Sequence, residues 1–327
     1  MSSSCPDTPA WQDRCFSKAE LMGDAGGDDA APDSDAGAPG SSCPGIEEVT
    51  QSVLSGYQVT TVSDNGDRCC YHGYYPCEGR PLLQADEPVL ADTVLRGDWL
   101  IEYAEELLLD DLAPDTRSRL ARAWARDAAF EHASIASFAH FMADLLSFGA
   151  PLELVREAER ALADEVRHAE LCYELASRYA GRPLGPGPLA VPAFRPRTLR
   201  EVALATLDEG CIAETQAAYA ARQRLASASD PAVRSALQRI VADEERHAEL
   251  AFRFVRWALD REPAILPEIV RAFDRACAFR AAAMVADLGD AAVLHAHGQL
   301  LPAERQHLAQ AAIERIIEPC RQALVSS

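Results

Sequence analysis

The chain has 327 residues, of which 48% are hydrophobic and 25% are charged, and its formal net charge at pH 7 is −20. This length and apolar content allow a sizeable core and more than one domain. The acidity is uneven, because residues 1–114 carry 22 Asp or Glu against 5 Lys or Arg. Such a charge argues against nucleic acid or an anionic membrane as a partner, since both require clustered Lys and Arg.

Residues 1–45 are expected to form a disordered acidic tether. The stretch 22–45 consists almost entirely of Gly, Ala, Asp, Ser and Pro and offers very little apolar surface to bury. Residues 1–20 lack the basic start and apolar run of a signal peptide, and no apolar stretch reaches the roughly 18 residues of a membrane span. The default expectation is a cytoplasmic protein without a membrane span.

Residues 46–88 have the character of a small Cys-rich β-hairpin module. Asn65-Gly66 lies between two short runs with strand composition, which is a strong hairpin signal. Clustered cysteines in a short segment predict a disulfide framework, which would need an oxidising compartment such as a periplasm or cell envelope. Zinc binding by Cys69, Cys70, His72 and Cys77 is the alternative, although adjacent cysteines fit tetrahedral spacing poorly. The connectivity stays open for the six clustered cysteines, Cys5, Cys15, Cys43, Cys69, Cys70 and Cys77.

The remaining sequence predicts a mostly helical protein. Residues 89–115 are interpreted as a linker with a short helix, after which apolar residues recur at three- and four-residue steps. Gly149 and Pro151 end the first long helix. Four long helices are expected over residues 116–261, namely one up to Gly149 and three over 151–180, 197–228 and 231–261. A C-terminal helical extension is expected over 262–327, most clearly at 267–286 and 302–324.

One motif occurs twice, once in the second predicted helix and once in the fourth. Glu165 and His168 lie in the sequence ADEVRHAEL, and Glu244 and His247 lie in ADEERHAEL. A spacing of three residues places a carboxylate and an imidazole on the same helix face. In both helices that face is otherwise apolar, and Glu131 falls within the apolar stripe of the first helix. These ionisable groups are therefore expected to point into the core.

A bundle would not keep unpaired charges in its core without compensation, because each costs several kcal/mol. Two divalent metals would cancel the charge of four glutamates, with two neutral imidazoles completing the coordination. The third helix must supply the fourth glutamate and offers Glu209 and Glu214. The spacing of an internal repeat favours Glu209, leaving Glu214 either an outer or switching ligand or a solvated residue. A metal-free network is the alternative, but it would require six mutually satisfied groups.

The order Glu131, Glu165-x-x-His168, Glu209, Glu244-x-x-His247 resembles the ferritin-like di-iron carboxylate superfamily, which includes bacterioferritins, rubrerythrins and bacterial multicomponent monooxygenases. The resemblance covers residues 116–261 and implies an all-α fold. This would be a ferritin-like four-helix bundle with extra C-terminal helices and a small Cys-rich N-terminal module. It also implies two bound iron ions, with manganese as the alternative. Either Glu165 with Glu244, or Glu131 with Glu209, would bridge the metals.

The resemblance also implies a role for the aspartate that precedes each Glu-x-x-His. In these families it accepts a hydrogen bond from the histidine of the partner helix, which would pair Asp164 with His247 and Asp243 with His168. The alternative is a surface Asp bonded to Arg167 or Arg246. The remaining candidates are weaker: His132 and His140 point away from the Glu131 face, Cys172 lines the pocket or packs, and His295, His297 and His307 lie outside the four helices.

Three functions are compatible with these features. The first is an oxidase or oxygenase, a monomer or dimer that activates O₂ or H₂O₂ for an unidentified small-molecule substrate. It is favoured because the appended segments would obstruct assembly of a ferritin cage. The second is a ferroxidase or peroxide-scavenging iron protein. The third is a tethered binding protein with a structural metal site. The substrate, the metal and the compartment are not specified by the sequence.

Overall fold

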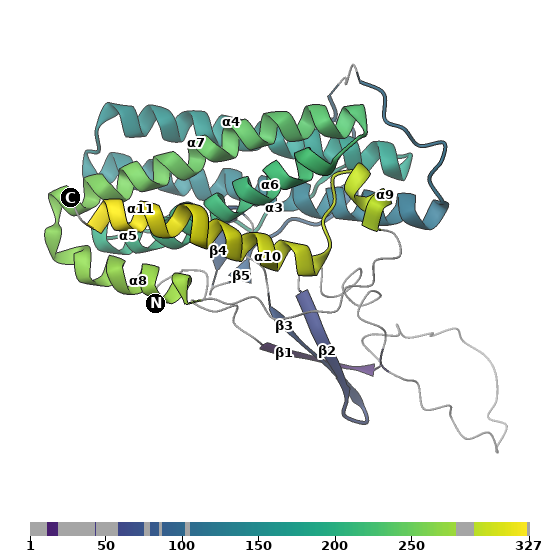
Figure 1. The fold of residues 1–327 in the computed structure, drawn as a ribbon, viewed down its shortest axis with the longest axis horizontal. Helices are drawn as coiled ribbons and strands as arrows, with labels where there is room; N and C mark the ends of the chain where they lie inside the picture. The colour runs from purple at the N-terminus through teal and green to yellow at the C-terminus, as the bar shows by residue number, and fades with distance from the viewer. Residues whose placement is uncertain are drawn as a thin grey trace. The chain divides into compact units, whose positions relative to one another are not determined.

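A computed structural model describes residues 12–18, 43, 58–74, 79–84, 87–101, 105–278 and 291–325. The chain divides into two compact units, one over residues 9–76 and the other made chiefly of residues 77–327. The first unit is built of strands and the second is mostly helical (Figure 1).

The strand unit is a three-stranded antiparallel sheet in the order β1-β3-β2. Its strands are β1 (Gln12–Ser17), β2 (Gln58–Asp64) and β3 (Arg68–Tyr74). The predicted hairpin is confirmed, because Asn65-Gly66 connects β2 to β3 and Gly66 has a φ of 84°. A positive φ is readily adopted by glycine. The Gly66 N–H donates to the Asp64 carboxylate at 3.1 Å, which closes the turn.

Two disulfides join the strand unit, Cys15–Cys70 and Cys43–Cys69. They confirm a disulfide framework, they leave no free thiolate at Cys69 or Cys70 for zinc, and they point to an oxidising environment. Cys5 and Cys77 lie outside the described residues. The prediction that residues 1–45 form a disordered tether is wrong for residues 12–17. These residues form β1, which pairs with β3 and is joined to it by the disulfide of Cys15. Its partner lies 55 residues away in sequence, so local composition carried no sign of it.

The four predicted long helices are confirmed. Gly149 and Gly181 adopt left-handed conformations and end the first two, as glycine at a helix C-terminus commonly does. Asp230 caps the last one by accepting from the Val233 N–H at 3.0 Å. The segments are α3 (Pro114–Phe148), α4 (Leu152–Ala180), the third helix as α5 (Leu199–Thr206), η1 (Leu207–Glu214) and α6 (Thr215–Ser227), and then α7 (Pro231–Arg261).

The third helix is interrupted in a way that the sequence did not indicate. Its middle portion η1 is a π-helix, in which backbone bonds span five residues instead of four. Such a turn changes which side chains face a neighbouring helix. It also packs closely on α7, because a Cβ at Gly210 would lie 2.4 Å from the Cβ of Ala251. Only glycine fits this contact without a shift of the backbone.

The helices bury two separate apolar clusters. One contains Phe138, Phe141 and Phe254, and the other contains Trp124 and Leu237. Each of the four long helices contributes to both clusters. Within each helix, the residues of one cluster lie in a different stretch from the residues of the other. A polar layer separates the two clusters. This layer holds the candidate metal centre described below.

The C-terminal extension is helical, as expected. Helix α10 packs along α6, so the extension covers part of the third helix (Figure 1). The expected helix over 267–286 is described as far as Cys277, and residues 279–290 lie outside the described part. The extension consists of η2 (Pro263–Ile265), α8 (Leu266–Cys277), α9 (Ala291–Ala296), α10 (Pro302–Ala312), η3 (Ile313–Ile317) and α11 (Glu318–Val325).

Between the strand unit and α3 the structure differs from the expected linker. Residues 89–101 and 105–113 contain no helix; instead β6 (Thr93–Leu95) pairs with β7 (Leu184–Pro186), directly after α4. The short strands β4 (Leu83–Gln84) and β5 (Glu87–Pro88) also belong to the helical unit, so the module boundary expected at residue 88 lies too far along the chain. In the described residues, no helix has both the length and the apolar character needed to cross a membrane.

Candidate metal centre

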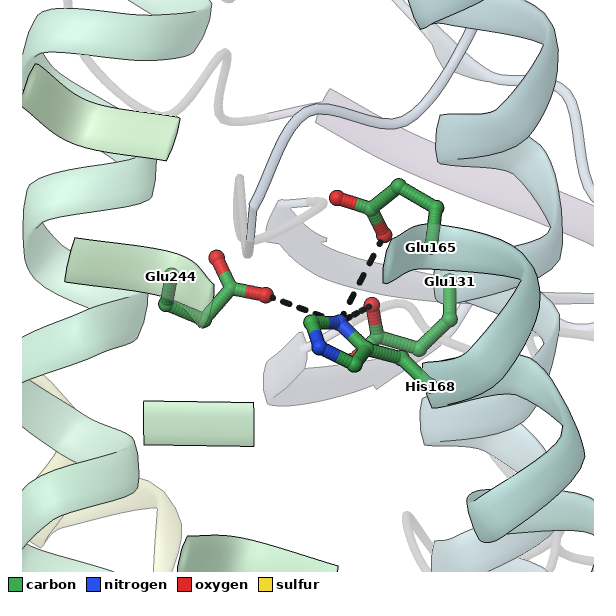
Figure 2. A group of neighbouring side chains, drawn as sticks. All are labelled: Glu131, Glu165, His168 and Glu244. Carbon is green, nitrogen blue, oxygen red and sulfur yellow. Dashed lines mark ion pairs between the residues drawn. The ribbon is translucent and has the colours of Figure 1, made fainter. Parts of the chain in front are cut away.

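The polar layer contains a first cluster of four potential ligands from three helices. Glu131 comes from α3, Glu165 and His168 from α4, and Glu244 from α7. Figure 2 shows the three carboxylates turned toward the His168 ring. One ligand atom from each side chain lies within 4.8 Å of those of the other three. Nδ1 of His168 is 3.3 Å from Glu244, 3.6 Å from Glu131 and 3.8 Å from Glu165.

A second cluster lies beside the first and shares Glu165 with it. It consists of Glu165, Glu214 and His247, whose ligand atoms are also within 4.8 Å of one another. Nδ1 of His247 is 3.1 Å from Glu165 and 3.9 Å from Glu244. The two imidazole rings are 5.9 Å apart between centroids. The structure therefore holds two adjacent groups of atoms that could bind metal ions.

Two of the carboxylates face both groups. Glu165 directs Oε2 toward His168 and Oε1 toward His247. Glu244 does the same, with Oε1 toward His168 and Oε2 toward His247. A carboxylate with one oxygen on each side is placed to bridge two cations. Of the two bridging pairs considered from the sequence, this arrangement favours Glu165 with Glu244.

Several donor atoms of the cluster are suited to bind a metal because they are buried and, among the described residues, have no hydrogen-bond partner. Within the described part of the chain, buried atoms of the cluster that lack a hydrogen-bond partner include both carboxylate oxygens of Glu214 and Nδ1 of His168 and of His247. Glu214 is 1% exposed and His168 is fully buried. Buried polar atoms normally have a partner, and leaving one without costs about 1–3 kcal/mol. Oxygen and imidazole donors in this proportion suit iron or manganese.

Burial also controls the charge of the cluster. It raises the pKa of Glu131 to about 8 and, with the neighbouring Glu244 charge, raises the pKa of Glu214 well above its usual value. Burial opposes the charged form of His247, yet the neighbouring carboxylates of Asp164 and Glu165 raise its pKa to about 9. In the absence of metal, protons therefore balance the acids at neutral pH. Divalent cations would have to displace these protons.

Each imidazole has an outer carboxylate on the side opposite the cluster. Nε2 of His168 hydrogen bonds with Asp243 at 3.1 Å, and Nε2 of His247 lies 3.6 Å from Asp164, which is longer than a hydrogen bond. The expected cross-pairing between helices is thus a hydrogen bond for Asp243 with His168, and a longer contact for Asp164 with His247. Such a contact fixes the ring orientation and leaves Nδ1 free to bind a metal.

The arginine contact of the alternative is also present, although both aspartates are buried and not on the surface. A single side chain, Arg246, donates to Asp164 at 2.8 Å and to Asp243 at 2.5 Å. Burial opposes ionisation of Asp243, yet its hydrogen bonds to His168 and Arg246 hold its pKa well below the usual range. Arg167, at the corresponding position of the first motif, pairs instead with Glu170. Arg246 therefore connects the outer sides of both histidines.

The preference for Glu209 as the ligand from the third helix is corrected by the geometry. Glu209 belongs to neither group of potential ligands, and its Oε2 lies 3.6 Å from Nε of Arg80. Glu214 takes its place. The repeat spacing assumed a continuous α-helix, whereas both glutamates lie in the π-helical η1, where the change of helical pitch alters the face on which each residue lies.

Arg80 is the buried residue next to the cluster that the sequence did not reveal. It is 2% exposed, and its guanidinium carbon lies 4.2 Å from the centroid of the Phe141 ring and 5.1 Å from that of Phe138. The ring of Phe138 in turn packs edge-on against His247. Arg80 lies outside the helices and strands, in a segment far from the helices in sequence, so no periodicity could have indicated it.

The other candidate residues lie outside both groups of ligands. His132 packs on Trp99 and His140 packs on Phe194. Cys172 is a buried free thiol whose pKa is raised by burial, consistent with the packing role. Of the C-terminal histidines, His295 pairs with Glu304 and His297 bonds with Tyr179, while His307 is absent from both groups.

Comparison of the chain with protein-family models, with curated proteins and with solved structures finds no match.

Proposed function

We propose that this protein is a dinuclear metal protein of the ferritin-like type, with an iron pair or its manganese counterpart, that acts as an oxidase or oxygenase. The observation that carries the proposal is the presence of two adjacent ligand groups sharing Glu165, each with its own imidazole. Glu131 and His168 would bind one metal, and Glu214 and His247 the other. Glu165 and Glu244 would bridge them. The order of these ligands along four helices supports the ferritin-like assignment.

The bound metals would supply the electrons with which O₂ or H₂O₂ is reduced. The protein's own residues prepare the site. Asp243 fixes the His168 ring through its 3.1 Å hydrogen bond, so that Nδ1 faces the glutamates. Phe138 and the surrounding apolar side chains exclude water, which strengthens each charge interaction within the cluster.

The extension supports an enzyme in preference to a cage-forming ferroxidase. A ferritin cage needs the outer faces of its helices for contacts with neighbouring subunits. Here α10 already packs on α6 and covers part of one such face. The ligand set itself would also serve Fe²⁺ as a substrate, so the activity must be measured directly.

Metal content tests the site. Purified without oxygen and supplied with Fe²⁺, the wild-type protein should bind about two metals per chain, and the Glu165→Ala, Glu244→Ala double variant should bind close to none, because both shared carboxylates are lost. A matched control is Glu159→Ala with Glu249→Ala, which removes two exposed glutamates from the same helices. The proposal fails if the first variant keeps its two metals or if the control loses them.

Oxygen consumption tests the reaction. An oxidase or oxygenase should consume O₂ in proportion to an added organic substrate, whereas a ferroxidase should do so with Fe²⁺ alone. A library of small organic compounds would be screened by oxygen electrode with the metal-loaded protein and with the Glu165→Ala, Glu244→Ala variant as the blank. Turnover of Fe²⁺ without any organic requirement would replace the oxidase assignment with the ferroxidase one.

A further inference from the structure

Arg80 is placed beside the metal cluster by a segment that does not belong to the four helices. The backbone there is attached to α3, since the Leu82 N–H donates to the Ala133 carbonyl at 3.3 Å. A Cβ at Gly79 would lie 3.9 Å from Oε2 of Glu214, so this segment is in contact with a proposed ligand. The side chain of Arg80 then extends between Phe141 and the third helix.

The guanidinium has few partners for a buried cation. Its Nη2 donates to the Thr206 hydroxyl at 3.4 Å, and its Nε lies 3.6 Å from Glu209 without a hydrogen bond, as judged over the described residues. A buried ion pair of this kind is often no more stable than a hydrophobic replacement. Stability of the core alone therefore gives little reason for the charge of Arg80.

The position of the Arg80–Glu209 pair suggests another reason for a buried charge at Arg80. Glu209 and Glu214 lie on one short π-helix, yet one is held by Arg80 and the other faces the imidazole of His247. Without Arg80, Glu209 would remain buried on the same helix as Glu214, and of the two arginines whose charge favours its ionised form only Arg197 would be left. The ligand count and the charge around the metals would then both change.

We propose that Arg80 is a positioning residue that holds Glu209 in an ion pair outside the metal cluster, so that Glu214 is the one ligand from the third helix. The Arg80–Glu209 pair also sets the charge beside the metals. This inference rests on the proposed dinuclear site and extends it to a residue that contributes no ligand. Its failure can be separated from that of the site, because metal content is measured first.

The experiment uses the full-length protein loaded with iron, and the readout is the reduction potential of the metal pair. Arg80→Met keeps a side chain of similar length between the phenylalanines but removes a positive charge, which should lower the potential. Glu209→Gln removes a negative charge and should raise it. The double variant should return close to the wild-type value, and Arg80→Lys, which keeps the charge, should also remain close to it.

Binding of Co²⁺ provides the second readout, because its visible spectrum reports the number and type of ligands. Glu209→Gln should leave the Co²⁺ spectrum unchanged, whereas Arg80→Met should alter it as the released Glu209 reaches the metal. Arg224→Met is the matched control, since Arg224 also lies over an aromatic ring, at 4.8 Å from Trp124, and also pairs with a buried carboxylate. It should change neither the potential nor the spectrum.

Opposite shifts in the two single variants would support the proposal, because damage to packing has no reason to reverse its sign. Shifts in the same direction, or none, would overturn it. Loss of Co²⁺ from Glu209→Gln but not from Glu214→Gln would show that Glu209 is the ligand, which overturns the inference and leaves the dinuclear site in place. If the wild-type protein binds no metal, both the dinuclear site and the role proposed for Arg80 are ruled out. Should Arg80→Met fail to fold, Glu209→Gln and Arg80→Lys still decide the outcome.

Discussion

The two histidines of the cluster have different outer contacts. His168 is hydrogen bonded to Asp243, whereas His247 lies 3.6 Å from Asp164. A hydrogen bond to an outer carboxylate orients the ring and increases its basicity, and its loss typically reduces metal affinity about 10- to 100-fold. The two proposed metal positions should therefore depend on their aspartates to different extents.

Asp243→Asn is expected to weaken metal binding at the His168 position by at least about tenfold, whereas Asp164→Asn should have the smaller effect. The reason is that only Asp243 is within hydrogen-bond distance of its histidine. Titration of each variant with Co²⁺, followed by absorption, gives the affinities of the two positions. Equal losses in the two variants would contradict the assigned asymmetry.

A second buried acid, Asp127, stabilises the fold away from the cluster. Its Oδ2 accepts from Arg224 at 2.6 Å and from Gln299 at 3.3 Å, which joins α3 to α6 and to the extension. Burial opposes its ionisation, but the charges of Arg224, Arg305 and Arg126, with the hydrogen bond from Gln299, together lower the pKa of Asp127 below the usual 3.8. The stabilisation is therefore present above pH 3.8 and is lost as the pH falls through the lowered pKa.

Asp127→Asn should reduce the free energy of unfolding by about 2 kcal/mol at neutral pH, because a charged hydrogen bond is lost. The difference from wild type should persist down to about pH 5 and shrink below the unfolded-state value of 3.8, where the wild-type carboxylate takes up a proton on unfolding. Urea unfolding across this range measures it. If the difference in unfolding free energy between Asp127→Asn and wild type grew as the pH fell, the prediction would be contradicted.

Among the elements, the π-helix η1 decides the composition of the cluster. It brings Glu214 to the imidazole of His247 and leaves Glu209 with Arg80. Its close contact with α7 depends on Gly210, since there is no room for a Cβ beside Ala251. π-Helical turns inside α-helices are frequently found at functional sites, which agrees with this location.

Gly210→Ala should therefore separate η1 from α7 and disturb the cluster, even though alanine has the higher helix propensity. We expect a loss of about 1–3 kcal/mol in unfolding free energy from overpacking, with reduced metal content. Gly97→Ala is the control, because a Cβ there would meet its nearest neighbour at an ordinary 3.8 Å. Thermal unfolding and metal analysis of both variants test these two expected losses. A Gly210→Ala protein with full stability and two metals would show that η1 tolerates displacement.

On the scale of the whole molecule, the two units are stabilised by different means. The strand unit is covalently closed by disulfides spanning 55 and 26 residues, each worth about 3–4 kcal/mol by loop-entropy arguments. The helical unit has two apolar clusters with the polar layer between them. The proposed metal ligands all lie in the helical unit.

Mild reduction should accordingly affect the two units unequally. We expect amide exchange to increase in β1, β2 and β3, while Co²⁺ bound by the helical unit stays at about two per chain. Hydrogen exchange and metal analysis of the reduced and oxidised protein measure both effects. Release of the metal on reduction would mean that the disulfides are required to maintain the cluster.

The sequence by itself determined those features that depend on local spacing. The 3.6-residue periodicity predicted the long helices, and glycines at 149 and 181 predicted where two of them end. The repeated Glu-x-x-His motif predicted that Glu165 and His168 share a face, because residues three apart do so on any α-helix. Asn65-Gly66 predicted the hairpin for the same reason, since its turn is a property of neighbouring residues.

Only the tertiary structure decided the features that depend on distant contacts. Glu214, and not Glu209, belongs to the cluster because a π-turn and the packing at Gly210 change the helix face, which a uniform periodicity does not anticipate. Arg80 enters the core from a segment 126 residues away from Thr206, to which it donates. Strand β1 is held by a disulfide to a residue far along the chain. Local propensity determines the elements, whereas the energy of burying and pairing charges determines which residues meet in the core.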